Sequence, residues 1–188
     1  QSVENIIDNL IDISNDNGPG IIIGYPRLHD NNLMNSAAII FNGNISIINK
    51  FHLPNYGVFD EKRVFNSDRV PGPIAFKDIR IGLMICEDMW YSDVSESLQE
   101  SGAQILIVIN GSPFDQNKED ERLSVAVSRV VETNLPLIYV NQIGGQDELV
   151  FDGSSFALDS SAKLCLQSPS WREEINKLEI IINNNGLS

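Results

Sequence analysis

Apolar residues recur over the first fifty positions in runs with a regular spacing. One set near the N-terminus repeats at intervals of three and four, which predicts an amphipathic helix that ends at Asn17-Gly18-Pro19-Gly20. A strand is expected from Ile21, followed by strands over residues 37–41 and 45–48, with the strong hairpin signal Asn42-Gly43 between them. The helical set consists of Val3, Ile6, Ile7, Leu10 and Ile11.

Strands continue in the second part of the chain. A break at residues 70–73 and a turn at Lys77-Asp78 lead to an apolar strand that starts at Ile79 and ends at Cys86. Further strands are expected over residues 105–109, 137–140 and 155–158.

Two helices are expected between these strands. One runs from Asp93, as its cap, to about Ser101, and the other covers residues 121–132 with four apolar residues on its buried side. These four are Leu123, Val127, Val130 and Val131. The alternation predicts an α/β architecture, although periodicity alone does not distinguish an α-β-β-α sandwich from a doubly wound sheet.

Composition narrows the class of protein without revealing its chemistry. The 188 residues fit one domain, and the net charge of −13 disfavours nucleic acid and anionic membrane surfaces as partners. No apolar run is long enough to span a bilayer, and two cysteines without a paired spacing give neither a disulfide framework nor a zinc site. We therefore expect a soluble cytoplasmic domain.

Cys86 is the most informative residue, because it follows a buried strand directly and precedes the acids Glu87 and Asp88. A thiol there can act as a nucleophile if a base or cation activates it, and Lys50 is a candidate cation. The simpler interpretations are a small buried hydrophobe for Cys86 and a solvated surface charge for Lys50. The backbone N–H after Cys86 is a natural oxyanion donor, with the lysine assisting.

Four segments of the chain carry a resemblance to a known family. They are Lys-Phe-His-Leu-Pro-Asn-Tyr-Gly-Val-Phe-Asp-Glu at 50–61, Gly-Leu-Met-Ile-Cys-Glu-Asp-Met-Trp at 82–90, Asn-Gly-Ser-Pro-Phe at 110–114 and the stretch 141–156. Together they resemble the glutamine-hydrolysing domain of bacterial glutamine-dependent NAD synthetases, a branch of the nitrilase superfamily with a Glu-Lys-Cys triad. The resemblance covers about residues 20–159 and implies the α-β-β-α sandwich.

The resemblance implies roles for particular residues. Cys86 and Lys50 would be triad members, and Glu61 would hold the lysine in place. Tyr56 would contact the glutamine, and Ser112 with Lys118 would bind its amino acid end. Without the resemblance, Glu61 is an ordinary turn acid, Tyr56 a loop aromatic packed on Pro54, Ser112 a turn serine and Lys118 an exposed lysine. Residues 142–148 would be a structural turn by default, but in the family they lie near the synthetase domain.

The sequence departs from the family at both ends. The triad's first Glu has no counterpart in the expected context, because the early acids Glu4, Asp8, Asp12 and Asp16 fall on the first helix or at its end. The opening strand, helix and second strand are also expected to be absent, as is the Ser-Gly-Gly-x-Asp-Ser phosphate-binding signature. We expect a partial carbon-nitrogen hydrolase domain over residues 1–182 and a frayed tail or linker over 183–188.

The function that the resemblance implies is hydrolysis of L-glutamine through a Cys86 thioester, with ammonia passed to a synthetase domain. No cofactor is expected in this chain, since ATP and magnesium would belong to that domain. The 188 residues are expected to be weak or inactive alone, and a homo-oligomer is expected. The alternatives are a non-catalytic interaction module and another nitrilase-superfamily amidase. A final expectation is that iodoacetamide labels Cys86 faster than Cys165 at neutral pH, because a cation favours the thiolate.

Overall fold

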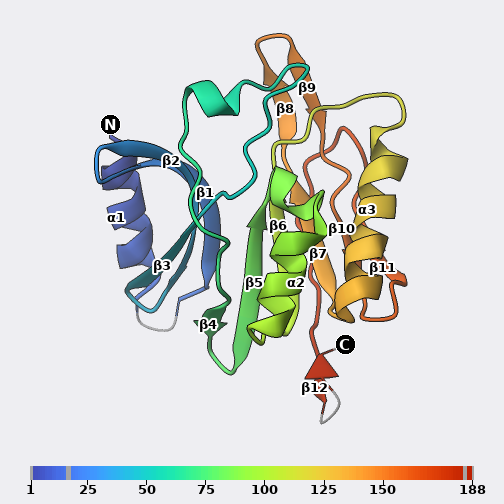
Figure 1. Ribbon diagram of the computed structural model, residues 1–188. Coiled ribbons are helices and arrows are strands. Elements are labelled where there is room, and N and C mark those ends of the chain that lie inside the picture. Colours follow the sequence, from blue (N-terminus) through green and yellow to red (C-terminus); the bar gives the residue numbers. More distant parts are fainter. Residues whose placement is uncertain (1, 16–17, 184–185, 188) are drawn as a thin grey trace.

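The computed structural model describes residues 2–15, 18–183 and 186–187, and it stacks the elements in four layers (Figure 1). Helix α1 (Val3–Ile13) covers one face of a three-stranded antiparallel sheet, which consists of β1 (Ile21–His29), β2 (Asn32–Phe41) and β3 (Asn44–Asn49). The other face packs on a six-stranded sheet, whose far side is covered by α2 (Ser92–Glu100) and α3 (Lys118–Thr133). The α-β-β-α sandwich is confirmed.

The larger sheet has the order β11-β10-β7-β6-β5-β4, and its central strands β5, β6 and β7 are parallel. Parallel strands place their carboxyl ends at one edge, which is where Cys86 emerges from β5. The short 3₁₀ helix η2 (Cys86–Met89) follows at once, and η1 (Glu61–Arg63) lies in the long loop after β3. The strand bounds are Ile74–Phe76 for β4, Ile79–Ile85 for β5, Ile105–Asn110 for β6, Leu137–Asn141 for β7, Phe156–Leu158 for β10 and Leu164–Gln167 for β11.

Strand β2 shows how the layers are joined. Its alternate residues Ala38 and Ile40 pack with Ile7 of α1, while Ala37 and Ile39 face the larger sheet. Both faces of β2 are therefore buried, which explains its continuous apolar run. A third cluster fills the space between the larger sheet and the helices α2 and α3.

Most predicted elements are present, and the two predicted hairpin turns are confirmed. Asn42 and Gly43 both have positive φ, +49° and +72°, as a tight β-hairpin requires, and Lys77 also turns with φ +50° between β4 and β5. Strand β1 forms one edge of its sheet, and Pro26 is tolerated there because a missing N–H matters least at an edge.

Two expectations about the helices were wrong in detail. Tyr91 precedes α2 as its cap residue, so Asp93 lies in the first turn instead. Val131 is 66% exposed, and Arg122, Ala126 and Arg129 are buried on α3 with Val130. The division into a domain over 1–182 and a tail over 183–188 stays a prediction. At this boundary β12 (Ile182–Asn183) pairs with β13 (Gly186–Leu187), while residues 184, 185 and 188 lie outside the described residues.

The loop between β7 and β10 contains a hairpin that was expected to be a plain turn. Its strands are β8 (Ile143–Gln146) and β9 (Leu149–Asp152), and it projects from the top of the molecule in Figure 1. None of the helices in the described part of the chain is both long and apolar enough to cross a membrane.

Candidate active site

The turn at Cys86 presents the thiol at the end of a buried strand. Ile85 is the last residue of β5, and the backbone then adopts φ +46° at Cys86, a left-handed conformation that is uncommon for a residue with a side chain. Such a conformation costs on the order of 1 kcal/mol and persists only where its surroundings hold it. Strained turns of this kind are concentrated at functional sites, so this backbone indicates Cys86 as a candidate functional residue.

Cys86 lines a pocket of about 660 Å³ between the two sheets. Lys50 and Glu61 line the same pocket, so the structure brings these three predicted residues together. The other lining residues are Gly24, Tyr25, Pro26, Asn35, Phe59, Phe65, Ile85, Ile109, Asn110, Gly111, Gln142 and Gln146. Within the described ranges, no group of three or more His, Cys, Asp or Glu side chains is arranged to hold a metal ion.

Lys50 and Glu61 form an ion pair inside this pocket. The Lys50 side chain is 1% exposed, and its Nζ donates to Oε1 and Oε2 of Glu61 at 2.8 and 2.9 Å. Asn35 also donates to Glu61 Oε2, at 3.4 Å. A buried ammonium is tolerated only when it is paired, so Glu61 keeps a cation beside Cys86. The geometry fits the predicted role of Glu61, although the role in catalysis stays a prediction.

Hydrogen bonds to the Asp88 carboxylate connect the loop that carries Lys50 to the turn that carries Cys86. Its Oδ1 accepts from the backbone N–H groups of Phe51 and His52 at 3.1 and 2.8 Å, and its Oδ2 accepts from Ile85 at 3.1 Å. Burial raises the pKa of Asp88 to about 6, against the lowering effect of these hydrogen bonds. The carboxylate thus sets the relative positions of the lysine and the thiol.

Burial also raises the pKa of the Cys86 thiol, to about 11. Lys50 opposes this shift, as expected from its charge, but Glu87, Glu61 and Asp88 add to it. The lysine therefore favours the thiolate without producing it at neutral pH. With a pKa near 11 the thiol is mostly neutral at pH 7, while the relative labelling rates of Cys86 and Cys165 stay a prediction.

The pKa of Cys86 leads to a testable prediction. At pH 8 only about one Cys86 in a thousand is a thiolate, so alkylation by iodoacetamide should be slow there and its rate should still be rising at pH 10. Peptide mapping over a pH series measures the rate, with Cys165, which is exposed, as the internal reference. A rate that levels off below pH 9 would show that the thiol ionises far more easily.

Tyr56 lies at a neighbouring position but not in the lining of this pocket. Its hydroxyl donates to both carboxylate oxygens of Glu87 at 2.9 and 3.0 Å, and its ring contacts Phe59 edge to face. Burial and the bond to Glu87 raise the pKa of Tyr56. Phe59 lines the pocket, and Glu87 follows Cys86 directly. Tyr56 therefore contacts a lining residue and the neighbour of Cys86 without lining the pocket itself.

Ser112 and Lys118 are likewise outside the pocket lining. Ser112 is 4% exposed and bonded to Arg122 and Asn141, whereas Lys118 places its Nζ 4.1 Å from the centre of the Trp90 ring and pairs with Glu121. The two side chains thus have different partners. Their roles in substrate binding stay predictions.

Several pocket residues were not singled out from the sequence. Asn110 ends β6 and Gly111 follows it, while Gln142 precedes β8 and Gln146 ends it. The segments 110–114 and 141–156 carry the resemblance but gave these residues no role, and the polar, glycine-rich stretch at 142–148 is equally typical of a surface turn. Pairing of β8 with β9 turns this stretch into a wall of the pocket.

Comparisons with known proteins agree with this geometry. The family model "Carbon-nitrogen hydrolase" matches residues 3–184. A glutamine-dependent NAD(+) synthetase of Rhodobacter capsulatus is 38% identical over 164 residues, which is 87% of this chain and 30% of that protein. One from Aquifex aeolicus is 38% identical over 157 residues, 82% of this chain and 28% of its own length.

Solved structures are similar as well. The glutamine-dependent NAD+ synthetase of Acinetobacter baumannii superposes with a TM-score of 0.84 and 31% identity over 91% of this chain and 32% of its own. A carbon-nitrogen hydrolase of Helicobacter pylori gives 0.82 at 24% identity, over 90% of this chain and 65% of its own, and shows the fold alone. The chain thus spans about a third or less of the length of the synthetases that it matches.

Proposed function

Because the chain belongs to the carbon-nitrogen hydrolase family, we propose that its pocket hydrolyses the side-chain amide of L-glutamine through a thioester on Cys86. The observation that supports this most strongly is the left-handed turn at Cys86 facing a pocket that also holds the buried Lys50–Glu61 ion pair. Relatives at 38% identity are named glutamine-dependent NAD(+) synthetases, which supports glutamine as the substrate.

The proposed reaction has two halves. The Cys86 sulfur attacks the amide carbon, and the resulting oxyanion is stabilised by the Lys50 ammonium and the backbone N–H of Glu87. The C–N bond then breaks, and ammonia leaves with the proton that the thiol gave up. Water next attacks the thioester carbon and returns a proton to the sulfur, which releases L-glutamate and restores the thiol.

A thiol with a pKa near 11 needs a base during the attack. Among the acidic side chains that the structure describes, Glu61 lines the pocket, but Lys50 donates to both of its carboxylate oxygens. Asp88 is occupied by backbone N–H groups, and Glu87 by Tyr56. General acid–base help typically contributes ~10²–10⁴-fold, so with these three acids occupied we expect ammonia release by these 188 residues to be slow.

We further propose that the ammonia serves a synthetase activity that makes NAD, since the matched relatives carry that name. ATP and magnesium would act in that activity rather than in this pocket. Self-association of the chain stays a prediction.

The test is to incubate the chain with L-glutamine, measure ammonia, and map any acyl adduct by mass spectrometry after an acid quench. We expect slow ammonia release with an adduct on Cys86, and neither in a Cys86→Ser variant. An adduct formed faster from a simple aliphatic amide than from glutamine would instead support a different amidase. No adduct and no ammonia from any amide would support a non-catalytic module.

A further inference from the structure

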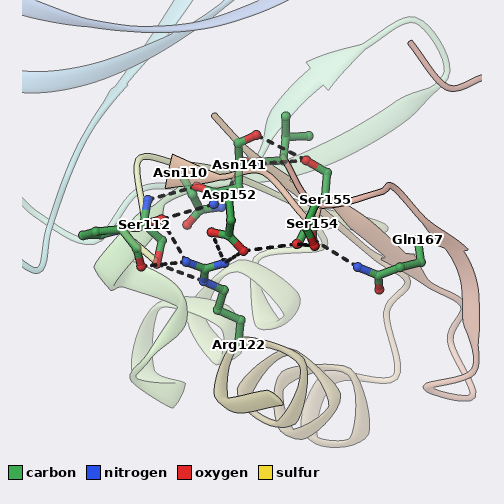
Figure 2. A network of polar contacts seen from close by, with 11 residues as sticks. Asn110, Ser112, Arg122, Asn141, Asp152, Ser154, Ser155 and Gln167 are labelled. Atoms are coloured by element: carbon green, nitrogen blue, oxygen red, sulfur yellow. Dashed lines mark hydrogen bonds and ion pairs between the residues drawn. The ribbon is translucent and has the colours of Figure 1, made fainter. Parts of the chain in front are cut away.

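Among the described residues, Arg122 is the largest fully buried side chain, and it does not line the pocket. Figure 2 shows it in a network of polar contacts with Ser112 and Asp152. It comes from the first turns of α3 and is 1% exposed. Its Nε donates to Ser112 Oγ at 3.1 Å, and its Nη2 donates to the carbonyl oxygens of Ser112 and Pro113 at 2.9 and 2.8 Å. One guanidinium therefore fixes both the side chain and the backbone of the loop after β6.

The other branch of the guanidinium reaches β9. Nη1 of Arg122 donates to both oxygens of Asp152 at 2.9 and 3.0 Å, and Asp152 is itself 1% exposed. The hydroxyl of Ser154 donates to Asp152 Oδ2 at 3.1 Å and lies 2.7 Å from that of Ser170. The ion pair and these hydrogen bonds thus form one network that joins α3, β9 and the segment near Ser170.

The two segments that Arg122 joins are continuous with two walls of the pocket. Ser112 follows directly on the lining residues Asn110 and Gly111, while Asp152 pairs in register with Ile143, next to the lining residue Gln142. The walls also touch, because a Cβ added at Gly111 would lie only 3.3 Å from the side-chain nitrogen of Gln142.

Asn141 links the same two walls at a second point. It is the last residue of β7, and its Oδ1 accepts from the Ser112 N–H at 2.9 Å while its Nδ2 donates to the Ser112 carbonyl at 3.2 Å. Ser112 is therefore held from both sides, by Arg122 and by Asn141. A loop held in this way keeps one position.

A buried ion pair is a poor source of stability, because removing two charges from water costs about as much as their attraction returns. An apolar pair of similar volume would serve the core as well. We infer that Arg122 is a positioning residue, which holds the Asn110–Gly111 wall against the Gln142 wall so that the pocket keeps a shape complementary to L-glutamine. The choice of L-glutamine as the ligand rests on the proposed function. The positioning of the two walls by Arg122 does not depend on it.

The shape of the guanidinium explains why an arginine stands at this position. Its planar fork serves Asp152, a serine hydroxyl and two carbonyl oxygens at once, which the point charge of a lysine ammonium cannot do. We therefore expect Arg122→Lys to preserve the charge but not the position of the loop.

The decisive variant removes both charges, Arg122→Met with Asp152→Asn, so that no unpaired ion remains in the core. Its matched control is Arg129→Met with Glu132→Gln, which removes a different ion pair of α3, joined at 2.9 Å. The readout is the L-glutamine concentration that half protects Cys86 from iodoacetamide. Because a wall displaced by about 1 Å can cost as much as ~10²-fold, we expect this concentration to rise at least about tenfold in the first variant. It should stay within about twofold of the wild type in the control.

Hydrogen exchange provides a readout that needs no glutamine. The N–H groups of Ser112 and Phe114, which bond to Asn141 and Val150, should exchange at least about tenfold faster in the first variant, with those of β5 unchanged. Unchanged exchange at both residues would overturn the inference, as would unchanged protection by glutamine. If glutamine fails to protect even the wild type, the proposed function fails and exchange alone decides the role of Arg122. If the double variant does not fold, Arg122→Lys is judged by the same two readouts.

Discussion

Replacing Lys50 with methionine is expected to slow ammonia release and Cys86 acylation by about 10²–10³-fold, the usual cost of removing one oxyanion donor. The methionine keeps much of the volume of the lysine but removes the cation that opposes the raised pKa of Cys86. Both the electrostatic support for the thiolate and the stabilisation of the oxyanion would be lost. Ammonia assays and the mass of the acylated chain measure the effect.

The control is Lys62→Met, because Lys62 lies in the same loop and is exposed. It should retain the wild-type rate. Lys50→Met also leaves the Glu61 carboxylate, 21% exposed, without its partner, so thermal unfolding must show that the variant is folded at the assay temperature. A folded Lys50→Met variant with the wild-type rate would exclude the lysine from the reaction.

Among the substitutions predicted for this chain, Asp88→Ala should lower the free energy of unfolding most. The change leaves the buried N–H groups of Phe51, His52 and Ile85 without their acceptor, at about 1–3 kcal/mol each, and we expect a total loss of about 3–5 kcal/mol at pH 7. For a chain of this size the midpoint of thermal unfolding should fall by about 10 °C. Circular dichroism on heating tests this, and a fall of less than about 2 °C would contradict the role of Asp88.

The pH dependence of the same residue has a definite sign. The pKa of Asp88 is about 6 in the folded chain, above the ordinary 3.8 of an aspartate, because burial disfavours its charged form, so the folded state holds its proton more tightly. The corresponding stabilisation is complete below pH 4 and disappears as the pH rises through 6, and it amounts to about 3 kcal/mol. Comparing denaturant unfolding of the wild type with that of Asp88→Asn between pH 4 and 7 isolates this contribution, because the variant cannot titrate. Equal pH profiles would contradict it.

The sequence predicted the fold wherever local signals decide the structure. Asn42-Gly43 specifies a tight turn through its own backbone preferences, and the apolar run up to Ile85 has the length of a buried strand. Val131 was misplaced because helical spacing alone does not show which stripe of α3 faces the sheet. Arg122 was missed for the same reason, since nothing local indicates that a charged residue is buried against a partner 30 positions away.

The candidate site was predicted only where a residue carries its chemistry alone. Cys86 and Lys50 stood out by type, and the structure places both in one pocket with Glu61. The pKa of the thiol could not be predicted, because it depends on how much protein surrounds the sulfur and on three acids from two different segments. Asn110 and Gln142 belong to segments that carry the resemblance but had no predicted role, because their place in the pocket comes from the pairing of β6 with β7 and of β8 with β9.

A mostly neutral Cys86 thiol should be oxidised only slowly by peroxide. Peroxide oxidises thiolates to sulfenic acid, and further oxidation to the sulfinic acid is irreversible for most proteins. A thiol with a pKa near 11 exposes almost no thiolate between turnovers, so we expect it to survive oxidative stress that inactivates cysteine enzymes with a permanent thiolate. The burial that makes Cys86 dependent on a base therefore also preserves it.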